Sequence, residues 1–403
     1  MKARTFRTSL TDWRIAPAAV VVLALVVALA PSADAQTFND VFVRTLTDNC
    51  QGLQGEAGPY GPRLAAICTI PGGDAQSTGA LSIDTRGGAG EEQRVLRRLK
   101  EKRDGQAASA DADMGTGLRG LSLFGSGDYQ AFEKGVTKFE PGYDRDTFGA
   151  TAGADYSFDG RAVLGLAFNY SHADGTFLRR GGDFETESFG PTLYGSLLAV
   201  PNLFVDGYAG YARRNYTTDR RFDFSNPTTN LVHARVHGDT DGDEYRAGIA
   251  TGYDFALGAL TVGPRVGMDF SELVIDRYTE RGGTGLELSY FRQHRTSLTS
   301  TVGGRASYAF STGFGVLVPQ TTFDWVHEFE DDQRVIYFKF AEDLGGTKLR
   351  FQNDTPDRDY FNAGAGLVLV LPGGYSPFVN FREFFGYRKE SSHTITVGLR
   401  FTF

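Results

Sequence analysis

The sequence lacks a second long apolar run, a surplus of basic residues and more than two cysteines in its 403 residues. Only residues 18–30 form an apolar run, so no later segment reaches the roughly 20 apolar residues that a membrane-spanning helix needs. The 41 Lys and Arg against 49 Asp and Glu argue against nucleic acid as a partner, because phosphate binding needs a basic surface. Two thiols are also too few for a structural zinc site.

Catalytic and cofactor signatures are missing as well. Residues 115–120 satisfy G-x-G-x-x-G, but they precede a predicted strand, whereas a dinucleotide site needs the motif between a strand and a helix. The acidic run 239–244 fails the EF-hand pattern because its twelfth position is Ala250; we interpret it as a solvated loop, with a calcium site at the loop base as the alternative. No H-E-x-x-H or G-x-S-x-G occurs. We therefore expect no cofactor, no metal and no enzymatic activity.

What is present begins with a secretory signal peptide over residues 1–35. Four basic residues precede the apolar run Ala18–Ala30, and the small residues of Ala33–Ala35 form a cleavage site ahead of Gln36. The apolar run is shorter than a spanning helix requires. We therefore expect the chain to be exported.

Residues 36–90 are expected to form a short, mainly helical segment followed by a flexible linker. Apolar residues occur at helical spacing before Cys50 and around Cys68, whereas residues 71–90 are rich in Gly, Ser, Asp and Thr. An exported chain meets an oxidising compartment, so a Cys50–Cys68 disulfide is expected. Chain-entropy models assign about 3 kcal/mol to a loop of that size.

From Leu118 to Phe403 the sequence alternates apolar with small or polar residues, and this period of two predicts strands. In residues 259–270, "ALTVGPRVGMDF", the apolar side chains occupy one face and Thr, Gly, Arg and Asp the other. Twelve strands are expected, near residues 118–130, 144–158, 161–174, 184–200, 202–218, 239–257, 259–278, 293–310, 313–330, 357–371, 374–388 and 391–403.

The connections between these strands alternate between short and long. The tight turns are Asp159-Gly160, Pro201-Asn202, Gly258-Ala259, Thr312-Gly313 and Gly373-Gly374. Long polar loops are expected around 131–143, 175–183, 219–238, 279–292 and 331–356, and Lys389-Glu390 is the one short connection on their side. An even number of antiparallel strands with all tight turns at one end predicts an all-β fold, a transmembrane β-barrel. Lipid offers no hydrogen bonds to the backbone, and closure of the barrel gives every strand amide a partner on a neighbouring strand.

The two faces of the strands are expected to differ in polarity. Charged residues on the inward rows should line the lumen: Asp155, Arg246, Asp254, Arg265, Asp269 and Arg305. The last strand presents an apolar row from Ile395 to Phe403, which would be an aggregation hazard at the edge of a soluble sheet. As the strand that closes a barrel, it instead faces lipid.

Residues 142–175, residues 238–255 and the terminal Phe403 resemble the translocator barrels of autotransporters, the type V secretion proteins of Gram-negative bacteria. The resemblance covers roughly residues 115–403. It implies a monomeric twelve-stranded barrel in the outer membrane, surrounded by lipid and lipopolysaccharide, with a helical linker in its pore. It also implies delivery by periplasmic chaperones and recognition by the barrel-assembly machinery of a C-terminal signal, here Leu399, Phe401 and Phe403.

Residues 91–105, "EEQRVLRRLKEKRDG", are the helix expected in the lumen. Acidic residues begin it, basic residues end it and Gly105 follows it, which suits the helix dipole and a glycine cap. We expect Arg94, Arg97 and Arg98 to meet inward acids such as Asp155, Asp254 or Asp269; the alternative is a solvated surface helix. The resemblance adds no catalytic residue, and the asparagine at which some members cut their linker is missing between Arg94 and Arg119.

The expected organisation is a signal peptide (1–35), a short passenger-like segment (36–90), a lumen helix with its junction (91–117) and a barrel (118–403). The expected function is to translocate the short segment and anchor it at the cell surface. One alternative is a non-secreting outer-membrane channel or structural barrel plugged by its own helix. A less favoured one is an outer-membrane phospholipase, but the adjacent Ser171 and His172 should point to opposite faces of their strand.

Overall fold

A computed structural model describes residues 75–77 and 120–403, apart from positions 138, 179–180, 227–228, 344 and 347. The chain divides into two compact units, Met1–Ala35 and Gln36–Phe403, and every described residue belongs to the second. Within the described ranges, no helix is long and apolar enough to cross a membrane. The predicted signal peptide, the Cys50–Cys68 disulfide and the helix with Arg94, Arg97 and Arg98 lie outside these residues.

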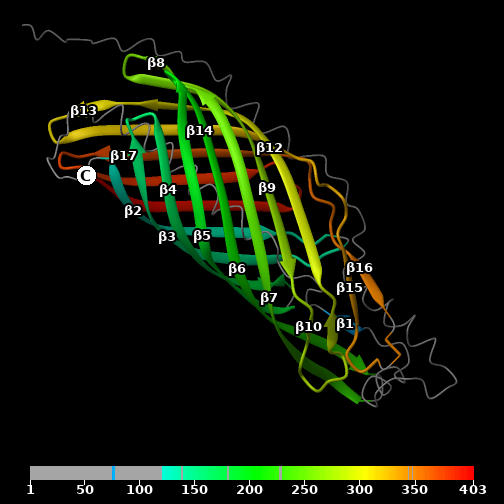
Figure 1. Ribbon diagram of the computed structural model, residues 1–403. Helices are drawn as coiled ribbons and strands as arrows, with labels where there is room; N and C mark the ends of the chain where they lie inside the picture. Colours follow the sequence, from blue (N-terminus) through cyan, green and yellow to red (C-terminus); the bar gives the residue numbers. More distant parts are fainter. Residues whose placement is uncertain are drawn as a thin grey trace, which may run out of the picture. The chain divides into compact units, whose positions relative to one another are not determined.

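The described chain is built from antiparallel strands that close into a twelve-stranded barrel (Figure 1). Each strand pairs with the next along the chain, and the last pairs with the first from Glu390↔Lys134 to Thr402↔Ser122. The wall consists of β2 (Leu121–Lys134), β3 (Tyr143–Phe158), β4 (Ala162–Phe177), β5 (Gly182–Val200), β6 (Leu203–Asn226), β7 (Thr229–Tyr253), β9 (Leu260–Ile275), β12 (Gln293–Tyr308), β14 (Gly315–Glu328), β17 (Asp359–Val370), β18 (Tyr375–Phe385) and β19 (Glu390–Thr402). Short strands β8 (Phe255–Leu257) and β13 (Phe310–Thr312) follow β7 and β12.

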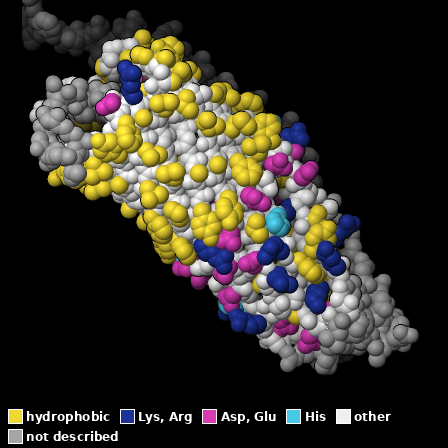
Figure 2. All heavy atoms as spheres, in the orientation of Figure 1, with side chains coloured by type: hydrophobic (Ala, Val, Ile, Leu, Met, Phe, Trp, Pro, Cys, Tyr) yellow, Lys and Arg dark blue, Asp and Glu magenta, His cyan; other side chains and the backbone are white. Residues whose placement is uncertain are grey.

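Side chains alternate between the outside and the inside of this wall, as the period of two predicts. On β4, Leu166 and Phe168 are more than half exposed, whereas Ala167 and Asn169 between them are only 1% exposed. Apolar side chains gather over the outer wall, while charged side chains gather toward the end opposite the C-terminus (Figures 1 and 2). The predicted lipid-facing row of the last strand is confirmed by the exposure of Ile395, Val397 and Leu399.

The tight turns all lie at one end of the barrel, which we call the turn end, and the C-terminus lies there too. Asp159 and Gly160 have φ values of 50° and 66°, so both central residues of the β3–β4 turn are left-handed. This is the backbone of a type I′ hairpin, for which Asp-Gly is a preferred sequence. The predicted turns are therefore confirmed; we call the opposite end the loop end.

One predicted loop is wrong. Residues 219–238 are not a loop, because β6 and β7 stay paired to within two residues of each other beyond the apolar band. The polar residues that led to the loop prediction instead form ion pairs on the outer face of these strands, such as Arg221–Asp183 and Arg235–Asp219. The acidic run 239–244 lies within β7, in agreement with the predicted strand 239–257 and not with its interpretation as a solvated loop.

Two other predicted loops contain strands of their own. Loop 279–292 holds the second residue of β10 (Tyr278–Thr279) and all of β11 (Leu288–Tyr290), and loop 331–356 holds β15 (Val335–Phe340) and β16 (Leu349–Gln352). These four strands pair in the order β10-β11-β15-β16, and we call them the loop sheet. A further short strand, β1 (Ala75–Ser77), pairs with β6 at Phe222–Phe224, near the loop end.

Candidate functional site

The inner wall of the barrel is polar and charged. Of the six residues predicted to face inward, Asp155, Arg246 and Arg305 are at most 6% exposed. Arg265 and Asp269 line a cavity of about 290 Å³ in the lumen, and Asp254 accepts a hydrogen bond from Arg305. The predicted lumen-facing rows are therefore confirmed, and the lumen offers a water-compatible passage rather than an apolar core.

Ion pairs inside the lumen join strands that are not neighbours. Arg265 on β9 donates from Nε to Asp324 Oδ1 on β14 over 2.8 Å, and so passes across β12. Arg305 on β12 reaches across β9 to Asp254, with an Nε–Oδ1 distance of 2.9 Å. Such charge-assisted pairs are short and directional, so they fix the wall geometry over three strands at a time.

The acids that were expected to meet the lumen helix have different surroundings. Asp254 is already bound by Arg305, whereas Asp155 and Asp269 accept hydrogen bonds from the hydroxyls of Tyr194 (3.0 Å) and Tyr208 (2.9 Å). The analysis of the sequence missed Asp206, which is 3% exposed and accepts a 2.6 Å hydrogen bond from Ser196. Its place in the alternating stretch "LFVDGYAG" on β6 would have identified it as inward-facing.

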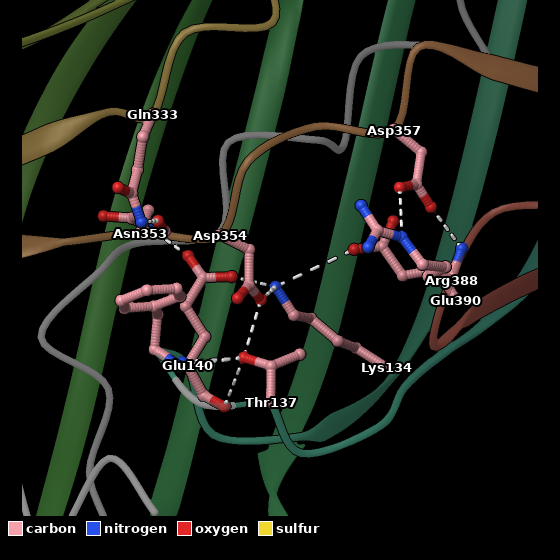
Figure 3. Close-up of polar contacts among 10 residues, drawn as sticks. Lys134, Thr137, Glu140, Gln333, Asn353, Asp354, Asp357, Arg388 and Glu390 are labelled. Atoms are coloured by element: carbon pink, nitrogen blue, oxygen red, sulfur yellow. Dashed lines mark hydrogen bonds and ion pairs between the residues drawn. The ribbon is translucent and has the colours of Figure 1, made fainter. Parts of the chain in front are cut away.

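At the loop end, a buried lysine gathers carboxylates from three parts of the chain (Figure 3). Lys134, the last residue of β2, is 4% exposed and forms an ion pair with Glu140 of the β2–β3 loop. Its Nζ also lies 3.2 Å from Asp354 Oδ2 and 3.7 Å from Glu390 Oε1. Since Lys134 and Glu390 are the cross-strand pair that ends the β2–β19 seam, this cluster holds the β14–β17 loop against the point of closure.

Further hydrogen bonds fix the same loop in place. The side-chain amide of Asn353 donates to Glu140, and the Thr137 hydroxyl donates to Asp354 Oδ2 over 2.8 Å. On the β18–β19 hairpin, Arg388 Nε donates to Asp357 Oδ1 over 2.6 Å. Figure 3 shows these side chains converging from β2, the β14–β17 loop and the β18–β19 hairpin. We call Lys134, Glu140, Asn353, Asp354 and Glu390 the seam cluster.

A second buried ion pair attaches the loop sheet to the barrel. Arg220 of β6 and Glu280 of the β9–β12 loop have side chains only 2% and 3% exposed, and Arg220 Nε lies 3.0 Å from Glu280 Oε1. Arg220 also donates to the Leu286 carbonyl over 3.1 Å, and Glu280 accepts from the Leu288 amide over 2.8 Å. The charges are thus both paired and hydrogen-bonded, which a buried ion pair needs in order not to destabilise the fold.

The core beneath the loop sheet is aromatic. Tyr278 and Tyr290 stack with ring centroids 4.6 Å apart, and Tyr278 packs against Tyr216, Leu273 and Ile275 of the barrel strands. Burial raises the pKa of both Tyr278 and Tyr290 well above the usual range, so both hydroxyls stay neutral at physiological pH. The loop sheet therefore covers the inner faces of β6 and β9 with a dry core.

Glu287 organises the turn that leads into β11. Burial disfavours its ionised form, but hydrogen bonds from the amides of Thr284 (2.6 Å) and Gly285 (2.7 Å) outweigh this, so the pKa of Glu287 is lowered. The pattern is that of a carboxylate held by backbone donors.

The structure separates the other residues weighed from the sequence. Ser171 is buried toward the lumen and His172 lies on the outer face, so they do not form a nucleophile–base pair. Asp241 and Asp243 lie on the outer face and bind Arg213, whereas Glu244 points inward to Arg214. The acids of this run therefore point to both faces of β7, and among the residues that the structure describes no group of three or more His, Cys, Asp or Glu is placed to hold a metal ion.

The predicted C-terminal signal lies on the outer wall at the turn end. Leu399 is 48% exposed, and the rings of Phe401 and Phe403 meet edge to face with centroids 4.4 Å apart. Phe401 also contacts Tyr375 across the β18–β19 pair, at a centroid distance of 4.8 Å. The three residues form an accessible apolar row; their recognition by the assembly machinery stays a prediction.

Comparison with known proteins extends these observations. The family model "Autotransporter beta-domain" matches residues 123–382. The translocator domain of the autotransporter NalP from Neisseria meningitidis is similar in structure, with a TM-score of 0.57 and 14% identity over 77% of this chain and 98% of that chain. The β-domain of the Bordetella autotransporter BrkA has a TM-score of 0.50 and 15% identity over 70% of this chain and 100% of that chain.

Sequence relatives match only part of the chain. The uncharacterised Escherichia coli (strain K12) protein YaiT is 32% identical over 119 residues, which is 29% of this chain and 11% of YaiT. Esterase EstA of Pseudomonas aeruginosa is 26% identical over 162 residues, or 39% of this chain and 24% of EstA. The chain therefore spans less than a quarter of the length of each of these two relatives.

Proposed function

The chain belongs to the autotransporter β-domain family, and from this premise we propose that its barrel carries residues 36–90 through the lumen and anchors them outside the cell. The barrel itself is an outer-membrane autotransporter translocator barrel. The observation that carries the proposal is a closed barrel wall with a polar interior. The chain enters the wall at the turn end, where β2 begins and where the Phe403 amide donates a hydrogen bond to the Leu121 carbonyl.

The direction of passage follows from the two ends. Outer-membrane barrels place their short turns in the periplasm, so Gly120 and the chain before it join the barrel from the periplasmic side. The backbone pairing of β1 with β6 near the loop end places residues 75–77 at the opposite end from Gly120. These opposite positions support export of the segment that precedes residue 78.

The lumen helix is part of the same proposal. Its Arg94, Arg97 and Arg98 match the charge of the inward acids of the barrel. Asp155 and Asp206 lie near the turn end and Asp269 lies nearer the loop end, and each accepts a hydrogen bond from a hydroxyl of the wall. A charge left in a partly desolvated lumen is costly without a partner. A variant lacking residues 91–105 should therefore conduct more current in planar bilayers than the full barrel; an unchanged conductance would argue against a plug.

Surface exposure tests the proposal directly. Intact cells are treated with proteinase K and probed with antibodies against residues 36–90 and against the barrel. We expect loss of the N-terminal signal while a periplasmic marker protein stays intact. Protection of residues 36–90 in intact cells, with digestion only after the outer membrane is permeabilised, would contradict export and favour a channel or structural barrel. Hydrolysis is not part of the proposal, because Ser171 and His172 lie on opposite faces.

A further inference from the structure

The loop sheet has two unlike faces. One face is buried, and Leu288, Tyr290, Ile336 and Phe338 on it are at most 2% exposed. The other face is open. The four strands contain no Asp or Glu, although the chain as a whole carries a net charge of −8. An acid-free sheet face is therefore a distinct region in an acidic protein.

Three cations and two aromatic rings gather on the open face. Lys339 pairs across the sheet with Ser289, and Arg350 pairs with Tyr337. Lys348 lies with its Nζ 3.8 Å from the Tyr337 ring centroid and 5.3 Å from that of Phe291. The rings are 39% and 40% exposed. A cation held over a ring keeps its position with its donors still available, because the attraction comes from the ring face.

These cations differ from several other exposed cations of the loop end. Arg281 is bound to Asp239, Arg292 to Asp276 and Arg358 to Asp331. Lys339, Lys348 and Arg350 form no ion pair with any described residue. Their charge is therefore not neutralised within this part of the chain, and it attracts an external anion.

The open face lies close to the outer rim of the membrane wall. Phe291 precedes the start of β12 by two residues, and Phe329, half exposed, directly follows the end of β14. In Figure 2, Lys and Arg side chains gather beyond the apolar band, on the side of the loop sheet. This is the height at which the headgroups of the outer leaflet surround a barrel whose apolar band is embedded in it.

We propose that Lys339, Lys348 and Arg350, with Tyr337 and Phe291, form a docking face for the phosphorylated saccharide of lipopolysaccharide in the surrounding leaflet. The inference rests on the proposed placement of the loop end outside the cell. Basic clusters beside a membrane bind anionic headgroups, and exposed aromatic rings pack against the apolar faces of sugars. Phosphate matches the three cations in charge, and the sugar rings match Tyr337 and Phe291 in shape and polarity.

Binding to a water-soluble probe tests this face without the apolar band. The purified, refolded full chain is titrated with deacylated lipopolysaccharide that keeps its phosphates, and with the same saccharide after dephosphorylation. We expect binding of the phosphorylated saccharide only, weakened by added salt. The double variant Lys348→Ala/Arg350→Ala should bind about thirtyfold more weakly, since each cation near an anionic surface contributes measurably. Arg358→Ala is the matched control, because it removes an exposed cation of the same loop that Asp331 neutralises.

Several results would overturn the proposal. Equal binding by the double variant and by the wild-type chain would show that this face is not the site, and equal binding of the dephosphorylated saccharide would show that phosphate is not recognised. Binding of a heparin oligosaccharide without binding of the deacylated lipopolysaccharide would assign the face to a soluble polyanion instead. The binding assay uses purified protein and involves no export. Its result is therefore distinguishable from a failure of the surface-exposure experiment.

Discussion

The two ends of the barrel connect their strands in different ways. At the turn end, two to four residues reverse the chain between strands, and a left-handed backbone conformation, as at Gly258, is sufficient for the reversal. At the loop end, the connections fold into a second sheet attached through buried charges, Arg220–Glu280 and the seam cluster. Buried ion pairs are costly to desolvate and tolerate no missing partner. The attachment of the loop-end connections therefore depends on the presence of every partner.

The largest effect on this comparison should come from Arg220→Ala. It leaves Glu280 buried without its cation, and such a loss typically costs about 3–5 kcal/mol. We expect the loop sheet to detach, seen as faster amide hydrogen exchange in β10, β11 and β15 while the barrel strands stay protected. The control at the turn end is the exposed Arg161, where Arg161→Ala should change stability by less than about 0.5 kcal/mol. Unchanged exchange in the loop sheet would contradict the anchoring role.

The next largest effect should come from Lys134→Met in the seam cluster. The carboxylates of Glu140, Asp354 and Glu390 would lose their shared cation, and repulsion among them should release the β14–β17 loop at a cost of about 3 kcal/mol. Limited proteolysis should then cut between residues 341 and 357 in the variant and spare the wild type. A resistant loop in the variant would show that the neighbouring hydrogen bonds suffice.

Acid should loosen the loop end before the turn end. The pKa of Glu287 lies below its usual value of 4.5, so the folded state favours the ionised form. Its contribution is complete above that usual pKa and is lost as the pH falls through the lowered folded value. We expect the protection of the Thr284 and Gly285 amides from hydrogen exchange, measured relative to the intrinsic rate at each pH, to fall in that window. Glu287→Gln should remove the pH dependence and cost about 1 kcal/mol at neutral pH; an identical pH profile in the variant would rule out Glu287 as its source.

A similarly small effect should come from Gly160→Ala at the turn end. An added Cβ meets no atom within 4 Å, so the only cost is the left-handed backbone with φ of 66°. That strain amounts to about 1 kcal/mol, measurable as a small shift in the urea midpoint of the refolded barrel. A loss several times larger would mean that this turn carries interactions beyond backbone conformation.

The predictability of the fold follows from how local each signal is. Alternation within one strand predicted all twelve strands and both faces, because neighbouring residues decide which side is apolar. The loop sheet was not predicted, since β10 and β11 have only two and three residues and β15 pairs with a segment about fifty positions away. Arg220–Glu280 depends on the same distant packing. Lys134 was not predicted either, because it fell in the predicted loop 131–143 and its partners Asp354 and Glu390 are more than two hundred positions away.

The central claim is that β2 and β19 close the barrel around the lumen, and a crosslink across that seam tests it most directly. In a chain whose native cysteines are replaced by serine, Gly127→Cys and Val397→Cys place thiols on directly paired outward positions. Paired strand positions match disulfide geometry. The account predicts that oxidation yields a disulfide in high proportion and a barrel that resists heat unfolding in detergent until reductant is added. Failure of these two thiols to crosslink in the folded protein would contradict this closure.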